Sequence, residues 1–222
     1  MSTHTHRYPA SGEDTFVAQV ERAQLCDLFE SVGPQAPTLC GDWDTHHLVA
    51  HLVVREGTPL GIVNLLRPAV GDEEVERVVR ERDFDSLVDE IRAGPPRLSV
   101  FGTALTDKAG NGLEFFIHHE DVRRAQTEFD HREIPEWAED ELWTGLGFMG
   151  RRLLRKSPVG VELVRSDNAE RRVVGKKDPA VVIAGLPSEI TLFGYGRGAV
   201  ADLVFDGAPA DIARLQSAPL GL

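Results

Sequence analysis

The feature that most constrains this chain is the stretch Gly-Leu-Glu-Phe-Phe-Ile-His-His-Glu-Asp-Val-Arg-Arg-Ala at residues 112–125. Its apolar residues predict a helix that the core surrounds on several sides. Glu114 and His118 stand four residues apart, so a helix brings them to nearly the same face, about 6 Å apart along its axis. A carboxylate and an imidazole in such a setting need a partner, because burying either group alone is costly. A bound cation is one such partner.

A metal site at this helix needs a third ligand from elsewhere in the chain, since two ligands hold an ion poorly. His51 is the leading candidate, because it lies on the apolar side of another predicted helix. With Glu114 and His118 it would supply two nitrogens and one oxygen. Three protein ligands with an open fourth position are typical of catalytic zinc, whereas a structural site is closed by a fourth protein ligand.

Two other interpretations of the same residues remain open. His51 could be a hydrogen-bonded histidine of the core, and Glu114 could pair with His118 or with a nearby arginine, Arg123 or Arg124. Such pairing would satisfy the buried groups with no metal at all. The spacing alone favours these interpretations slightly over a metal site.

The neighbours of the predicted ligands have other expected contacts. His119 is expected to point away from the site, and Glu120 and Asp121 to pair with arginines rather than with a metal. No residue stands out as a general base, although His47 and Asp121 are conceivable. The predicted ligand set therefore includes no residue of the 119–121 run.

The composition is typical of a soluble globular protein, which we expect in the cytoplasm. Of its 222 residues, 41% are hydrophobic and 27% are charged, which suits one large domain or two modest ones. The sequence has no apolar run near 18 residues and no signal-peptide core at its N-terminus, so neither a membrane span nor export is predicted. Cys26 and Cys40 predict two small buried thiols rather than a disulfide framework.

The charge argues against a nucleic-acid partner. The formal net charge is −12 at pH 7, and nothing in the sequence concentrates positive charge on one phosphate-tracking face. The short pairs Arg123-Arg124 and Arg151-Arg152 are more typical of solvated helix faces than of a binding stripe. Nucleic acid is therefore not an expected partner, and the sequence carries no signal for an oligomeric state.

The pattern of apolar residues changes near Ser157-Pro158, where we predict a domain boundary. The predicted fold class is α+β, with a mainly helical domain at residues 1–157 and a small α/β domain at residues 158–222. Helices are predicted at residues 12–32, 44–56, 72–93 in two pieces and 111–126, and in a segment opened by Pro135. Beyond the boundary we expect strands at residues 159–165, 172–175, 180–184 and 201–206, a helix capped by Ser188, and a last helix opened by Pro209.

Two short motifs in the N-terminal half resemble a known family. Residues 38–43, Thr-Leu-Cys-Gly-Asp-Trp, are followed by residues 48–52, Leu-Val-Ala-His-Leu. Together they are similar to the N-terminal signature of the mycothiol-dependent maleylpyruvate isomerase family, which belongs to the DinB-like metal-binding four-helix bundles. The resemblance implies that His51 is a metal ligand, and Glu114 and His118 match the ligands that a later helix of the family carries four residues apart. Many DinB relatives have histidine at the position of Glu114, so the match is to the isomerase-like branch.

The resemblance extends, with weaker motifs, over roughly residues 12–222. Residues 185–190 and the pair Gly196-Arg197 are similar to the small α/β domain that this branch adds to its helical bundle. Residues 114–125 are more similar still to an actinobacterial subgroup of uncharacterised metal-binding proteins. The resemblance therefore implies a DinB-like four-helix bundle followed by a small α/β domain.

The resemblance also implies a reaction, with zinc or another divalent metal in the site and mycothiol as the thiol cosubstrate. An open zinc position can bind a thiol as thiolate, which is nucleophilic at neutral pH. The thiol would attack a small electrophile in an isomerase or S-transferase reaction. Arg197 is the candidate catalytic residue, which would stabilise carboxylate or enolate charge. The alternative is a non-enzymatic protein that binds a metal or another ligand.

Overall fold

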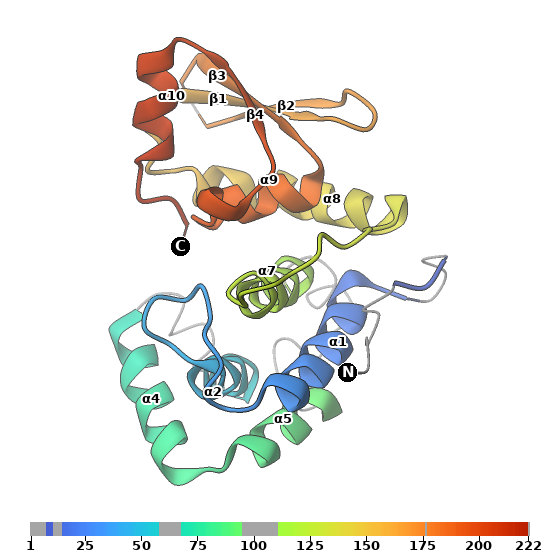
Figure 1. Ribbon diagram of the computed structural model, residues 1–222. Coiled ribbons are helices and arrows are strands. Elements are labelled where there is room, and N and C mark those ends of the chain that lie inside the picture. The colour runs from blue at the N-terminus through green and yellow to red at the C-terminus, as the bar shows by residue number, and fades with distance from the viewer. Residues whose placement is uncertain (1–7, 11–14, 58–67, 95–110, 176, 222) are drawn as a thin grey trace. The chain divides into compact units, whose positions relative to one another are not determined.

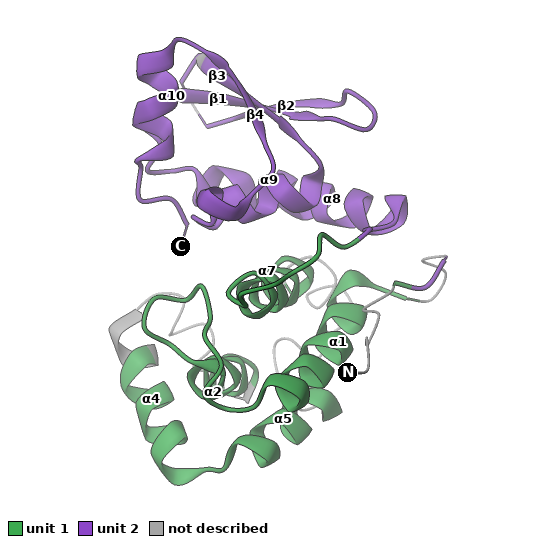
Figure 2. Ribbon diagram, viewed as in Figure 1, with its two compact units in different colours: residues 1–8, 14–132 green, residues 9–13, 133–222 purple. Residues whose placement is uncertain are grey.

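The computed structural model describes residues 8–10, 15–57, 68–94, 111–175 and 177–221 (Figure 1). The chain divides into two compact units, which Figure 2 colours separately. Unit 1 comprises residues 1–8 and 14–132, and unit 2 comprises residues 9–13 and 133–222. The fold is mixed α+β, as predicted, with helices in both units and a sheet in unit 2.

Helices make up unit 1 in the part of the chain that the structure describes. They are α1 (Val17–Val32), α2 (Thr45–Gly57), α4 (Pro68–Glu81), α5 (Phe84–Ala93) and α7 (Gly112–Arg123). α1 packs against α5 and α7, while α2 packs against α4 and α5. The predicted ranges agree within a few residues, although the predicted start of the first helix, at residue 12, lies outside the described residues. The four-helix bundle stays a prediction.

The core of unit 1 forms where the apolar faces of these helices meet. Its members include the buried side chains of Leu25, Phe29, Leu48, Leu52, Val75, Leu87, Ile91 and Phe115. α7 is enclosed on nearly all sides, since residues 115–122 are all buried. The polar side chains of α7 must therefore find their partners inside the protein.

The connection between α1 and α2 forms a tight turn against α7. Gly41 has a φ of 63°, in the left-handed region that favours glycine. The Thr38 hydroxyl donates to the Trp43 carbonyl at 2.6 Å. The Leu39 amide donates to the Asp121 carbonyl at 3.1 Å. The first bond closes the turn, and the second holds it against the C-terminal half of α7.

Unit 2 combines a four-stranded sheet with helices. The strands β1 (Gly160–Arg165), β2 (Arg171–Val174), β3 (Pro179–Gly185) and β4 (Val204–Gly207) lie in the order β2-β1-β3-β4. β1 and β3 are parallel, and the other neighbouring pairs are antiparallel. The remaining elements are α8 (Glu136–Leu153), α9 (Pro187–Gly194), the 3-10 helix η3 (Gly198–Val200) and α10 (Pro209–Gln216). α8 packs against α9 and β2, and α10 packs against β3 and β4.

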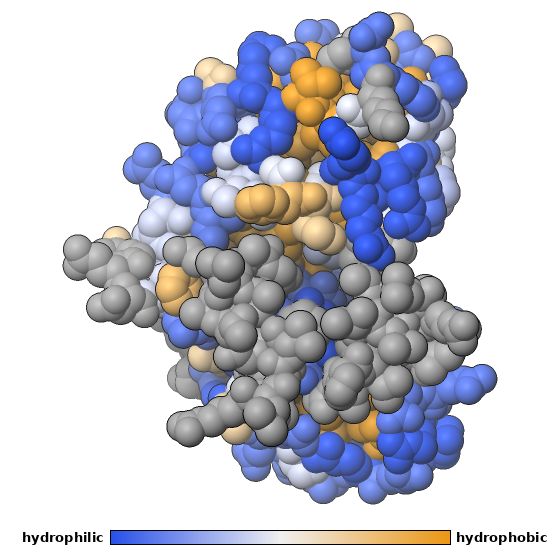
Figure 3. All heavy atoms as spheres, turned by 180° about the vertical axis from the view of Figure 1, so that it is seen from behind, coloured by the Kyte–Doolittle hydropathy of each residue, from blue (hydrophilic) through white to orange (hydrophobic). Residues whose placement is uncertain are grey.

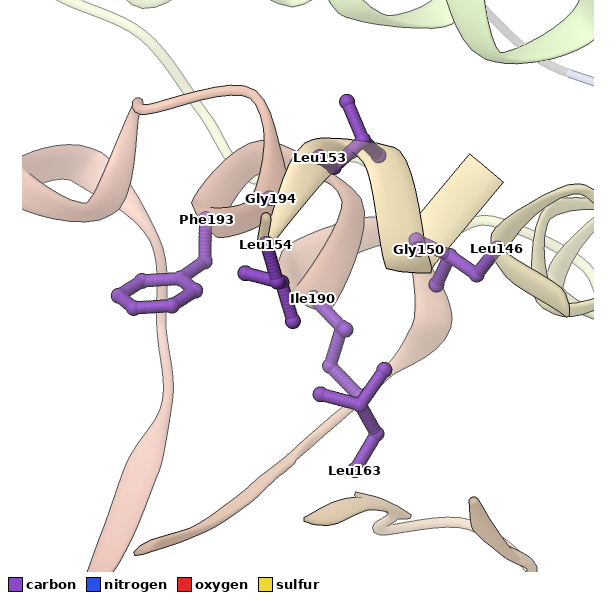
Figure 4. Close-up of a pocket in the computed structure, with 8 residues that line it drawn as sticks. All are labelled: Leu146, Gly150, Leu153, Leu154, Leu163, Ile190, Phe193 and Gly194. Carbon is purple, nitrogen blue, oxygen red and sulfur yellow. The ribbon is translucent and has the colours of Figure 1, made fainter. Parts of the chain in front are cut away.

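The interior of unit 2 between α8, α9 and β1 is apolar (Figure 4). The residues that line it are Leu146, Gly150, Leu153, Leu154, Leu163, Ile190, Phe193 and Gly194. Gly194 of α9 lies against α8, since a Cβ at that position would lie 3.4 Å from Leu153 Cδ1. This lining is apolar throughout, so the space serves packing rather than chemistry.

The compact units divide earlier than the predicted domain boundary. The division falls between Arg132 and Glu133, whereas the apolar pattern changes near residue 157. The change in the apolar pattern marks where the strands begin. α8 precedes that point in the chain but is part of unit 2, because it packs against α9 and β2.

The start of α9 also differs from the prediction. Its N-cap is Leu186, and Ser188 lies inside the helix, so the prediction that Ser188 caps it is wrong. Instead, the Ser188 amide and hydroxyl donate to Glu139 of α8 at 2.8 and 2.7 Å. A carboxylate from a neighbouring helix therefore satisfies an amide of the first turn.

The surface of unit 2 carries exposed apolar side chains: Phe148, Val173, Leu186 and Val204. Figure 3 shows hydrophobic residues of this unit gathered among hydrophilic ones in the upper part of the view. Cys26 and Cys40 are not joined in a disulfide; the first is buried and the second half-buried. Among the described helices, none has the length and apolar character needed to cross a bilayer.

Candidate metal centre

The structure brings the three predicted ligands together. His51 comes from α2, while Glu114 and His118 come from one face of α7. Glu114 Oε1 lies 3.6 Å from His51 Nε2 and 3.3 Å from His118 Nε2. One ligand atom from each residue lies within 4.8 Å of the other two. His118 is buried and the other two are half-buried, so the group remains open to solvent.

These distances suit a tetrahedral divalent ion. Bonds of about 2.0–2.1 Å from zinc to nitrogen and oxygen place neighbouring ligand atoms about 3.3 Å apart. The two separations from Glu114 Oε1 are 3.3 Å to His118 Nε2 and 3.6 Å to His51 Nε2. Zinc accepts two imidazoles and one carboxylate, and three protein ligands leave a position for a further ligand. The residues therefore fit the metal that the resemblance implies.

An arginine that sequence reasoning missed lies beside the candidate ligands. Arg55 Nε is 3.3 Å from Glu114 Oε1, and Arg55 Nη1 donates to Asn111 Oδ1 at 2.6 Å. Arg55 follows His51 by four residues, so both stand on one face of α2, and that spacing could have found it. Glu114 does pair with an arginine, but not with either of the two that the sequence suggested.

A second set of polar side chains lies on the other side of the His118 ring. His118 Nδ1 lies 3.0 Å from Asp121 Oδ2, and the Cys40 thiol donates to the same oxygen at 3.0 Å. Cys40 Sγ is 3.8 Å from His118 Nδ1. Asp121 was expected to pair with arginines; the structure brings it to His118 and Cys40, because its position three residues after His118 turns it toward that ring. These three residues also offer ligand atoms within 4.8 Å of one another.

The other polar residues of α7 have partners away from the candidate ligands. His119 Nδ1 contacts a carboxylate oxygen of Glu21 on α1. Glu120 pairs with three arginines, at 2.8, 2.6 and 2.7 Å: Arg123, Arg124 and Arg132. The expectations for His119 and Glu120 are confirmed. The first two arginines were expected on solvated faces, but their side chains are only 10% and 4% exposed.

The surroundings set the protonation of each candidate ligand. Burial lowers the pKa of His51 below its ordinary value. Burial acts to raise the pKa of Glu114, but Arg55 and the two histidines outweigh it and hold that pKa well below the usual range. Burial acts to lower the pKa of His118, but hydrogen bonds led by that with Asp121 raise it well above its ordinary value. Glu114 is therefore an anion and His51 is neutral, as metal ligation requires, while His118 must release a proton to bind.

The two conceivable general bases differ in their surroundings. His47 lies on α2 one turn before His51, with Nδ1 2.6 Å from Asp44 Oδ1 and Nε2 3.6 Å from Glu76 Oε1. Asp121 is fully buried and already accepts two hydrogen bonds. The His47 side chain is 24% exposed and that of Asp121 is fully buried, so His47 is the more accessible of the two.

Arg197, the predicted catalytic arginine, belongs to unit 2. It follows α9, is half-buried, and donates from Nη1 to the Tyr195 carbonyl at 2.6 Å. Gly196 before it has a φ of 85°, so the backbone turns sharply at that point. The role of Arg197 stays a prediction that rests on the resemblance.

The fold and the candidate site together define a mixed α+β protein whose helical unit gathers two histidines and one glutamate. A scan against models of protein families finds no match, and a search of curated proteins finds none either. Among solved structures, the chain is similar to the crystal structure of the mycothiol-dependent maleylpyruvate isomerase. The TM-score is 0.59 at 16% identity, and the match covers 86% of this chain and 90% of that chain. A histidine-to-alanine mutant of that isomerase matches with a TM-score of 0.53 at 15% identity. This likeness shows that the chain shares the isomerase's fold.

Proposed function

We propose that this chain binds a divalent metal and uses a low-molecular-weight thiol in an isomerase or S-transferase reaction on a small electrophile. Zinc is the expected ion, given the nitrogen-rich ligand set. Mycothiol is the expected thiol, because the similar structure is that of a mycothiol-dependent isomerase. The proposal rests on one observation above all, the convergence of His51, Glu114 and His118 within 4.8 Å in a chain of that fold.

In this proposal His51, Glu114 and His118 hold the ion. When bound, such an ion lowers the pKa of a thiol in its open position. Arg55, 3.3 Å from Glu114, adds a fixed positive charge at the edge of the site, where it would attract an anionic substrate or cosubstrate. Arg197 is the second candidate for that task, on the strength of the resemblance.

The proposal includes the finer structural expectations. We infer a DinB-like four-helix bundle followed by a small α/β domain, in the isomerase-like branch and close to its actinobacterial subgroup of metal-binding proteins. We also infer a cytoplasmic location, with neither nucleic acid nor a membrane as partner.

Metal content tests the ligand set. The purified protein should carry about one divalent cation per chain, and His51→Ala and His118→Ala should each lose it. His46→Ala is the matched control, because His46 lies on the same helix and its Nε2 contacts the Arg82 carbonyl at 3.2 Å. Full occupancy in the His51→Ala protein would remove that residue from the ligand set.

A non-enzymatic metal-binding protein is the alternative. Such a protein would lose its metal on the same substitutions, so metal content does not separate the two functions. The response to thiol does, because a closed fourth position binds the metal but admits no thiolate.

A further inference from the structure

The buried side of the His118 ring faces a carboxylate that is not one of the three proposed ligands. His118 Nδ1 lies 3.0 Å from Asp121 Oδ2, with side-chain exposures of 10% and 0%. An ionised carboxylate can only accept hydrogen bonds, so Nδ1 carries the hydrogen and donates it to Asp121. The other ring nitrogen, Nε2, then faces the proposed metal site, where it lies 3.3 Å from Glu114 Oε1.

The turn before α2 holds Asp121 at two points. The Cys40 thiol donates to Asp121 Oδ2 at 3.0 Å, and the Leu39 amide donates to the Asp121 carbonyl at 3.1 Å. The turn is itself closed by the bond from the Thr38 hydroxyl to the Trp43 carbonyl. The direction of the Asp121 carboxylate is therefore set by a segment far away in sequence.

We propose that Asp121 is a positioning residue, which fixes the ring orientation and tautomer of His118 for metal binding, and that Cys40 fixes the Asp121 carboxylate. This inference rests on the metal site of the proposed function. A carboxylate at Nδ1 leaves Nε2 as the ligand nitrogen and makes it a stronger donor. The same contact stops the ring from rotating, so less freedom is lost on binding.

A rival arrangement uses the same residues as ligands. Cys40, His118 and Asp121 could hold an ion themselves, with His118 bound through Nδ1. The distances between their ligand atoms are those of hydrogen bonds and are shorter than the distances expected around a shared zinc ion. Zinc bonds of about 2.3 Å to sulfur and 2.0 Å to oxygen would place those two atoms about 3.5 Å apart, and nitrogen and oxygen about 3.3 Å apart. The Asp121 oxygen lies 3.0 Å from both the sulfur and Nδ1.

The test measures zinc affinity of the full chain by competition with a chromophoric chelator. Asp121→Asn should weaken zinc binding by about 10–100-fold, because the amide loses the charge and can turn its NH₂ group toward Nδ1. Its cobalt form should also show shifted d–d absorption bands, which a loss of stability alone would not cause. Glu139→Gln is the matched control, a buried carboxylate changed to an amide in unit 2, and should bind zinc as the wild type does.

Cys40 supplies a second pair of variants that is less disruptive to folding. Cys40→Ser keeps a donor for Asp121 and should bind zinc nearly as tightly as the wild type. Cys40→Ala removes the donor and should bind about fivefold more weakly, the equivalent of one hydrogen bond.

The possible results separate this inference from the proposed function. Wild-type affinity and an unchanged cobalt spectrum in Asp121→Asn would overturn the positioning role while leaving the metal site in place. A sulfur-to-cobalt band in the wild type without added thiol, lost in Cys40→Ser, would show that Cys40 is a ligand and would also overturn it. A wild-type protein that binds neither zinc nor cobalt would overturn the proposed function, and this inference with it.

Discussion

Replacing Glu139 by glutamine should stabilise the protein above neutral pH and have little effect in acid. Glu139 lies in α8, is 2% exposed, and accepts hydrogen bonds from the amide and hydroxyl of Ser188. Burial raises the pKa of this carboxyl to about 7, although the two bonds from Ser188 act to lower it. Ionisation of Glu139 therefore lowers the free energy of unfolding.

The size of the effect follows from the raised pKa. The folded protein binds the Glu139 proton more tightly than the unfolded chain does, so the stabilisation is complete below the ordinary value of 4.5 and is lost as the pH rises through about 7. At about 1.4 kcal/mol per pKa unit, the full loss is about 3 kcal/mol. Most of that loss, about 2–3 kcal/mol, falls between pH 5 and pH 8.

Glutamine should abolish this pH dependence without losing the contacts. Its carbonyl can accept from the Ser188 amide, its NH₂ group can donate to the Ser188 hydroxyl, and it carries no charge at any pH. Urea unfolding at pH 5 and pH 8 would measure the change in stability of both proteins. Hydrogen exchange of the α9 amides would report on unit 2 itself. The same pH-dependent loss in both proteins would refute the assignment of this effect to Glu139.

Three further predictions concern the metal, the core and the substrate. Chelation should lower the Tm while the helical circular dichroism remains, because a ligand bound only to the folded state adds about 4 kcal/mol at a thousandfold excess over its Kd; an unchanged Tm after verified metal removal would contradict this. Glu56→Ala should cost about 3–5 kcal/mol in urea unfolding, because Arg22, 2.6 Å away and with a side chain only 10% exposed, loses its carboxylate. A loss below about 1 kcal/mol would show that the core accommodates the arginine. Arg197→Ala should lower turnover and leave thiol binding intact, since its proposed role is on substrate charge; unchanged turnover would remove it from the mechanism.

The part of the site that the sequence predicted depends on local periodicity. Glu114 and His118 share a face of α7 because they lie four residues apart in a helix, which any helical segment guarantees. His51 lies on another helix, and nothing in the spacing says which helices meet. Its place on the apolar side of a predicted helix made it the leading candidate, the resemblance implied that it is a ligand, and the structure sets it 3.6 Å from Glu114.

The missed contacts depend on packing between distant segments. Asp121 was expected to pair with an arginine, as a carboxylate among arginines commonly does. The turn before α2 brings Cys40 to within 3.0 Å of it, a contact that the sequence did not predict. Packing also explains why Ser188 does not cap α9. Because α8 lies against the start of α9, Glu139 of α8 accepts the hydrogen bond from the Ser188 amide. Such partners are set by which elements pack together, so no local pattern could predict them.

The most direct test of the proposed function adds mycothiol to the cobalt-substituted protein. A thiolate that enters the open position should produce a new sulfur-to-cobalt charge-transfer band. Cys40→Ser should show the same band, which excludes the protein's own thiol as its source, and His118→Ala should show none because it retains no cobalt. If cobalt is bound but millimolar mycothiol produces no band, the thiol-using reaction is contradicted, and a non-enzymatic metal-binding protein becomes the better description.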